Sequence, residues 1–235
     1  MLRNECTTLI QLDAATRLRE EDPYTSRIAA VAPTQLIGTR SRFEVDLNRP
    51  RAKAVYQCAE DAWGLEVWRD PLSTEHVERS LADYDAFYAE LERVLRDRER
   101  RYGRFLVLDI HSYNHRRDGS DGLAADPARN PEINIGTGTV DRRRWGALID
   151  RFCADLVAAS PAGRWLDVRE NVKFQGGHMS RWIRETFPTT GCALALEFKK
   201  MFMDEWTGRV DEGHLAGLIR AVGATLPGLA ESLRA

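Results

Sequence analysis

The sequence predicts a single-domain α/β protein in which a mixed, mostly parallel sheet is flanked by helices across residues 1–235. Three observations carry this prediction. Short apolar runs that suit buried strands alternate with amphipathic stretches at helical spacing. No Ser/Gly-rich or Pro-rich linker divides the 235 residues into two units. Neither an internal repeat nor a low-complexity segment interrupts the pattern.

The first predicted helix covers residues 5–20, because apolar side chains recur there at spacings of three. Its end carries three acids, Glu20, Glu21 and Asp22. The C-terminus of a helix prefers cations, so either these acids are solvated or a positive group lies beside them. Two extended stretches, IAAVA and TQLIGT, are expected next, followed by a short strand in FEVDLNRP that Pro50 ends.

The strongest predicted helix lies between His76 and Tyr102, where one apolar stripe runs along charged faces and Gly103 suits a left-handed cap. The next segment, RFLVLDI, is predicted to be a buried strand. Residues 116–140 are rich in Gly, Pro, Asp and Asn without an apolar period. A loop that long inside a compact domain is typically functional.

Asp141 is predicted to cap a helix that carries Trp145, Leu148, Phe152 and Leu156. A strand is expected near WLDVRENV, and the Gly176–Gly177 turn leads into a short amphipathic helix, HMSRWIRETF. CALALEF is the last predicted strand, and a final helix begins at about residue 211.

Composition excludes several classes of protein. Hydrophobic residues make up 43% and charged residues 30%, as in an ordinary globular protein. With 34 Lys and Arg against 36 Asp and Glu, the net charge of −2 gives no electrostatic reason to expect nucleic acid or an anionic membrane as a partner. The four cysteines are widely spaced, and neither a secretory signal nor a spanning run occurs. We therefore expect a soluble, cytoplasmic protein.

Polar residues interrupt the strand RFLVLDI where it should leave the core. Alternation puts Asp109 and His111 on the same side of the strand. A single histidine there could be a satisfied core residue, but neutral imidazole with a nearby carboxylate also suits zinc, and we favour metal binding. His115 has the spacing of a two-histidine metalloprotease motif without its helix or its glutamate, so we interpret it as a loop residue facing substrate or solvent.

Three further groups fall at predicted strand ends, where ligands of α/β proteins collect. Asn48 and Arg49 suit a carboxylate, although Arg49 could instead pair with Asp46. The Gly176–Gly177 turn is a candidate for substrate binding. Glu197 follows an apolar strand, where it is either paired with a neighbouring Lys or Arg or desolvated, with the raised pKa that suits a general base.

Taken in order, VDLNRP, DIHS, the Gly pair and ALALEF with the downstream MDEW resemble the N-formylglutamate amidohydrolase family. The resemblance runs from EEDPYT to MDEWTG. It implies a zinc-carboxypeptidase-like fold of the phosphorylase/hydrolase kind, distantly related to aspartoacylase-type deacylases. It also implies a zinc-dependent amidohydrolase of histidine degradation, which acts on the linear amide of N-formyl-L-glutamate or another short N-acyl acidic amino acid and releases formate in the first case.

The same resemblance implies a role for each matching residue. Asn48 and Arg49 would hold the acid end of the substrate, and Glu197 would activate the attacking water. His111 would bind one zinc ion, with Asp22 or Glu21 as a second ligand. Behind these ligands, Asp109 and Ser112 are expected to support the metal site from the second shell.

One departure from the family leaves the predicted zinc site short of a ligand. Family members usually begin with a strand and a turn of the kind P-H-x-G that supplies the first metal histidine, and this chain has no histidine before His76. We expect an N-terminally shortened chain whose sheet lacks a strand. Two alternatives are that His178 substitutes, or that the protein is an inactive homologue with an incomplete metal site that binds a carboxylated metabolite.

Overall fold

The computed structural model describes residues 1–161 and 164–234. The strands are β1 (Phe105–Tyr113), β2 (Ile133–Gly136), β3 (Val168–Glu170) and β4 (Gly191–Lys199). The helices are α1 (Ala14–Glu20), α2 (Thr25–Ala29), α3 (Thr74–Tyr102), α4 (Arg142–Ala158), α5 (His178–Thr186) and α6 (Glu212–Arg234). None of the described helices is long and apolar enough to cross a membrane.

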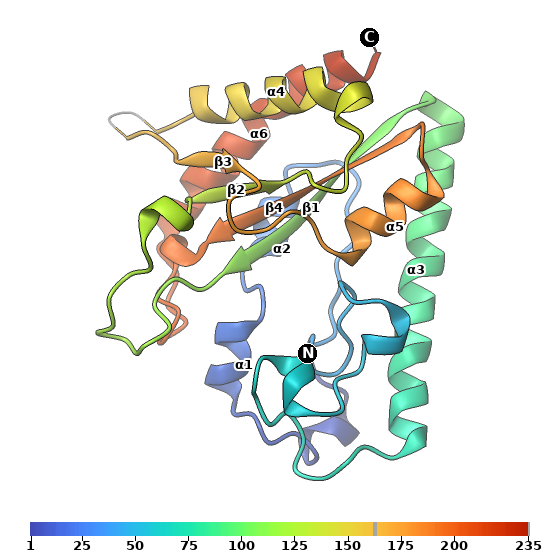
Figure 1. The fold of residues 1–235 in the computed structure, drawn as a ribbon, viewed down its shortest axis with the longest axis vertical. Helices are drawn as coiled ribbons and strands as arrows, with labels where there is room; N and C mark the ends of the chain where they lie inside the picture. Colours follow the sequence, from blue (N-terminus) through green and yellow to red (C-terminus); the bar gives the residue numbers. More distant parts are fainter. Residues whose placement is uncertain (162–163, 235) are drawn as a thin grey trace.

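The strands form one mixed sheet in the order β1-β4-β2-β3. The two long strands β1 and β4 run parallel, β2 is antiparallel to β4, and β3 is parallel to β2. Helices cover both faces of this sheet (Figure 1). The predicted α/β class with a mixed, flanked sheet is therefore confirmed.

Two layers of core lie on opposite faces of the sheet. One layer packs α4, α6 and Ile28 of α2 against alternate residues of β2 and β4, among them Ile133, Leu194 and Leu196. The other packs α3 and α5 against Phe105 and the small Ala193. Since side chains of a strand alternate between faces, each residue of β1 and β4 is assigned to one layer by its parity.

Helix α3 begins and ends close to the predicted positions, and α4 begins at the predicted cap. The Ser73 side chain accepts a hydrogen bond from the His76 N–H at the start of α3. Gly103 ends α3 with φ of 76°, a left-handed value that glycine adopts without steric cost. Asp141 accepts from the Arg143 N–H and so caps α4.

The N-terminal third is where the sequence predictions were wrong. The helix expected over residues 5–20 is instead a 3₁₀ turn (Asn4–Thr7) and the short α1, which the Asp13 side chain caps. IAAVA was expected to be extended, but its start lies in α2. FEVDLNRP forms turns rather than a strand, and TQLIGT is extended without pairing into the sheet. Further along, the long loop predicted for residues 116–140 contains β2.

A physical reason links these errors. Many of the N-terminal turns pack around a separate apolar cluster, which includes Phe43, Tyr56 and Trp68, while Ile28 and Val45 reach the core layers at the sheet. Apolar residues therefore recur there without the period of a helix or a strand. In β2 the short run INIG is buried on both faces, so it lacks the alternation that marks a half-exposed strand.

Candidate active site

A row of polar side chains crosses the sheet on the face that α3 and α5 cover. In the parallel register of β1 and β4, His111 lies directly beside Glu197. The same parity of β1 begins with the buried Phe105, which packs in the α3 and α5 layer. Along this face of β1 the side chains thus change from apolar to polar, ending on Asp109 and His111, and the row forms the floor of the candidate site.

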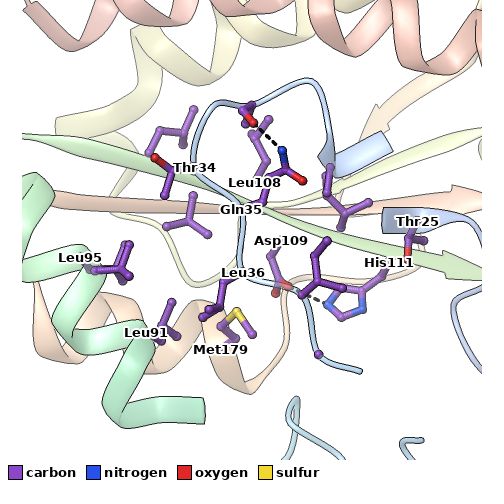
Figure 2. A pocket seen from close by; sticks show the side chains of 18 of the residues that line it. Thr25, Thr34, Gln35, Leu36, Leu91, Leu95, Leu108, Asp109, His111 and Met179 are labelled. Carbon is purple, nitrogen blue, oxygen red and sulfur yellow. Dashed lines mark hydrogen bonds and ion pairs between the residues drawn. The ribbon is translucent and has the colours of Figure 1, made fainter. Parts of the chain in front are cut away.

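The His111 ring lies between two carboxylates. Its Nε2 is 2.9 Å from Asp109 Oδ1 and its Nδ1 is 3.6 Å from Asp22 Oδ2. Figure 2 shows the contact between Asp109 and His111 on the floor of the groove. Burial alone would lower the pKa of His111, but the charges of Asp109 and Asp22 outweigh it and raise the pKa well above its usual value.

Asp22 is fixed in place by the end of β1. Its Oδ1 accepts hydrogen bonds from the Ser112 N–H and hydroxyl, at 2.7 and 2.9 Å. Burial would raise the pKa of this carboxyl, but His111, Arg42 and Lys200 together lower it. Two residues expected near the metal, Asp22 and Ser112, therefore contact each other, and Asp22 stays ionised beside His111.

Two cations that the sequence did not single out lie beside the acids at the end of α1. The buried Lys200 Nζ donates to the carbonyl oxygens of Arg19 and Glu21 and to Asn114. The Arg42 guanidinium donates to Asp46 at 3.0 Å and lies 4.0 Å from Asp22 Oδ2. Of the two settings expected for the acids at the end of α1, the structure shows a positive one, because Lys200 and Arg42 lie beside them.

Glu197 is half-buried and has no ion-pair partner among the described residues. Burial raises its pKa to about 7, against a lowering by His111. Of the two alternatives for this residue, pairing with Lys or Arg and desolvation, the geometry matches desolvation. A carboxyl with a pKa near neutrality can both accept and return a proton, as a general base requires.

Asn48 joins the row to the start of α5. Its side-chain oxygen accepts from the Met179 N–H at 3.1 Å, and its Nδ2 lies 3.3 Å from His111 Nε2. A Cβ atom at Gly177 would lie only 2.2 Å from Asn48 Oδ1, so only glycine leaves room for this contact. Gly176 has φ of 115°, which also favours glycine. The Gly pair therefore shapes the wall next to Asn48.

Arg49 lies at the rim of the site. Its Nε is 3.8 Å from Asp46 Oδ2, and its side chain is 38% exposed. Its guanidinium carbon lies 5.8 Å from the ring centroid of Trp63. The pairing with Asp46 that the sequence left open is present, but Asp46 already accepts from Arg42 and from Tyr56. At 3.8 Å its contact with Asp46 is longer than a hydrogen bond, so the partly exposed Arg49 guanidinium retains donors for a ligand.

Three candidate residues lie away from His111. Glu21 accepts a hydrogen bond from the Ser41 hydroxyl. The Nε2 of His178 lies 3.0 Å from the Tyr84 hydroxyl, against α3. His115 faces Glu205, with its Nδ1 3.8 Å from Oε1, and its side chain is only 13% exposed. His115 was predicted to face substrate or solvent; it is partly exposed and lines a second hollow beside Glu205, away from His111.

The donors around His111 fit two positions of a metal site. If Nε2 donates to Asp109, the lone pair of Nδ1 is directed towards Asp22, an arrangement found around metal-bound histidines. Their 3.6 Å separation is close to the roughly 3.4 Å between two ligands of a tetrahedral zinc ion with bonds of about 2.0–2.2 Å. Within residues 1–161 and 164–234, no group of three His, Cys, Asp or Glu side chains is placed to hold a metal ion.

The residues missed from sequence, Arg42 and Lys200, left weak signals. Arg42 stands four positions before Asp46, and Lys200 is the last residue of the run EFKK, which begins with Glu197. Both looked like ordinary surface cations, because Lys and Arg are almost never fully buried unless paired. Only the fold shows that α1 brings its acidic end to them.

Comparisons with known proteins bear on the family and the fold. A model of the N-formylglutamate amidohydrolase family matches residues 2–203. A crystal structure of N-formylglutamate amidohydrolase from Ralstonia eutropha superposes with a TM-score of 0.73 at 18% identity, covering 95% of this chain and 86% of that one. A gene product from Agrobacterium tumefaciens gives a TM-score of 0.64 at 17% identity, covering 98% and 87%. Comparison with curated proteins finds no match.

Proposed function

The chain belongs to the N-formylglutamate amidohydrolase family, and on this premise we propose that it hydrolyses the formyl amide of N-formyl-L-glutamate in a zinc-dependent reaction. Water adds to the formyl carbon, the C–N bond breaks, and formate and glutamate leave. The observation that carries the proposal is the position of Glu197 beside His111, in a half-buried setting whose desolvation raises its pKa to about 7.

Glu197 acts as the proton carrier of the reaction. As a carboxylate it removes a proton from the attacking water, and as a carboxylic acid it returns the proton to the leaving amine nitrogen. A pKa of about 7 lets both forms exist near neutral pH. His111 and Asp22 would hold the zinc ion, which when bound supplies Lewis-acid polarisation of the formyl carbonyl.

The substrate is oriented by its carboxylate. The guanidinium donors of Arg49 and the Nδ2 group of Asn48 suit the two oxygens of a carboxylate. Gly177 stands at the start of α5, whose positive end adds to this attraction. Arg42, close to Asp22 and aimed at the same region, supplies positive charge where the oxyanion of the addition step develops.

The experiment is formate release from N-formyl-L-glutamate by purified protein, with metal content measured on the same sample. Release that depends on added zinc supports the proposal. Release that persists unchanged after exhaustive chelation contradicts zinc dependence but leaves the hydrolase assignment standing. No release from a sample that retains bound zinc contradicts the hydrolysis itself.

A second candidate function is binding without turnover. It is favoured by the absence, among the described residues, of a group of three metal ligands. Such a protein would bind N-formyl-L-glutamate through Asn48 and Arg49, and calorimetry would detect this binding with zinc present or absent. Formate release in the same sample rules out this reading.

A further inference from the structure

The outer edge of β1 carries peptide groups that have no hydrogen-bond partner among the described residues. The Phe105 N–H donates to the Thr190 carbonyl at 3.0 Å, on the β4 side. Successive peptide groups of a strand point to opposite sides, so the N–H groups of Leu106, Leu108 and Ile110 point away from β4. Ser112 has the same parity, and its N–H reaches Asp22, outside the sheet. With β1 first in the strand order, this edge is open for pairing.

An extended segment forms a second wall opposite this edge. Residues 34–38 have no helix or strand assignment, and Leu36 and Ile37 are 38% and 46% exposed. Within the described chain, no backbone hydrogen bond involves Gln35, Leu36 or Ile37. The groove between this wall and β1 has a volume of about 1450 Å³. Figure 2 shows Thr34, Gln35 and Leu36 across from Leu108 and Asp109.

Both remaining sides of the groove are apolar. On one side α3 contributes Leu91 and Leu95, which Figure 2 shows pointing in. On the other side α6 contributes Leu226, Leu229 and Leu233. A strand that lies between two helical layers is buried on both faces and is apolar throughout. Whatever fills this groove therefore has apolar side chains on both faces.

The charges at the ends of the groove differ. At the start of β1 the lining carries three arginines, which are Arg98 of α3, Arg104 just before β1, and Arg144 of α4. The acids of the described lining, Glu21, Asp22, Asp46 and Asp109, belong to the His111 end, where Arg42 lies 3.0 Å from Asp46 and 4.0 Å from Asp22. Arg40 is also part of the lining. An occupant that complements these charges carries an acidic residue at the end next to Arg104.

We propose that this groove binds an extended peptide strand, apolar on both faces and acidic at the end beside Arg104, which pairs with β1 as an added edge strand of the sheet. Main-chain hydrogen bonds to Leu106, Leu108 and Ile110 supply affinity, and the two helical layers select apolar side chains. Glu197 is not part of the groove lining, although the lining continues to His111, Asp22 and Asn48 of the candidate site.

The test uses the full chain and a fluorescein-labelled peptide, Asp-Asp-Val-Ile-Val-Ala-Val-Ile-Lys, titrated by fluorescence anisotropy. One control peptide has alternate backbone nitrogens methylated, which removes strand donors without removing apolar surface. A second replaces both Asp residues with Lys. We expect saturable binding of the parent peptide, loss of binding on methylation, and affinity about tenfold weaker for the Lys peptide.

Protein variants locate the binding site. Arg104→Glu combined with Arg144→Glu should lower the affinity for the parent peptide and raise the affinity for the Lys peptide. The control Arg100→Glu, at an exposed position of α3 outside the groove lining, should change neither affinity. Circular dichroism and melting temperature confirm that each variant folds. Hydrogen exchange of the Leu106, Leu108 and Ile110 amides should slow when the peptide binds.

Three outcomes overturn the proposal. The first is the absence of saturable binding, and the second is equal binding of the methylated peptide. The third is concentration-dependent dimerisation that the peptide does not reverse, which would assign the β1 edge to a second copy of the chain. Glu197→Gln should leave peptide binding unchanged, so the result is independent of formate release.

Discussion

His111 and His115 lie four residues apart and each faces a buried carboxylate, yet their electrostatic settings are opposite. Asp109 and Asp22 outweigh burial and raise the pKa of His111. At His115, burial dominates, with the charges of Lys199 and Arg116 acting in the same direction, and the pKa falls to about 4. The neighbouring Glu205 does not reverse this, although its Oε1 lies 3.8 Å from His115 Nδ1.

The difference comes from what each carboxylate is already bound to. Glu205 accepts hydrogen bonds from the N–H groups of His115 and Arg116, so both of its oxygens organise the turn after β1. Asp109 places Oδ1 on the His111 ring, and its buried Oδ2 has no hydrogen-bond partner among the described residues. Asp109 therefore acts on the histidine ring, whereas both oxygens of Glu205 are used by backbone N–H groups.

The largest effect should be a difference in kcat between substitution of Glu197, beside His111, and substitution of Glu205, beside His115. Glu197→Gln removes the proposed base, so we expect kcat for formate release to fall about 10²-fold to 10⁴-fold. Glu205→Gln is the matched control, because burial also raises the pKa of Glu205 but its oxygens serve the backbone. Equal losses in the two variants would show that folding, rather than proton transfer, is being measured.

The pH dependence of stability should have opposite signs for the two histidines in metal-free protein. His115 has a folded pKa of about 4 and an ordinary value near 6.5, so the folded state binds fewer protons between these values. Its contribution is present above about pH 6.5 and is lost as pH falls to about 4, a change of about 3 kcal/mol. His111 has a raised folded pKa, so its contribution is present below about pH 6.5 and is lost as pH rises.

Urea unfolding of the wild type, His115→Asn and His111→Asn from about pH 4 to about pH 8 measures both signs. The free energy of unfolding of the wild type minus that of His115→Asn should increase as the pH rises. The corresponding difference for His111→Asn should decrease as the pH rises. Differences that run parallel for the two variants would contradict the opposite environments described for the two rings.

A third effect concerns metal binding. Asp109→Asn replaces the acceptor on His111 Nε2, which weakens the orientation and basicity of the ring, so zinc affinity should fall about 10-fold to 100-fold. Competition with a chromogenic chelator measures this affinity without any turnover. His115→Asn is the control and should leave zinc affinity unchanged. A larger loss for His115→Asn would place the metal at the other region.

Sequence alone predicted much of the His111 region and little of the His115 region. His111, Asp109 and Glu197 lie on long strands whose alternation fixes which face each side chain takes, so their meeting followed from parity and register. Arg42 and Lys200 could not be found this way, because they reach Asp22 through turns and through the end of α1. The contact of His115 with Glu205 spans 90 residues and depends on loop geometry that has no period.

The smallest effect tests the rim of the His111 region. Arg49→Ala removes the proposed carboxylate donor, so KM for N-formyl-L-glutamate should rise about tenfold, with a smaller loss in kcat because a misplaced carbonyl reacts more slowly. Arg116→Ala, which is next to His115, is the matched control and should leave KM unchanged, because no substrate contact is proposed there. For N-formyl-glycinamide, which has no carboxylate, the wild type and Arg49→Ala should have similar KM values. If Arg49→Ala changes both substrates equally, Arg49 acts through its contacts with Asp46 and Trp63 rather than by binding the carboxylate.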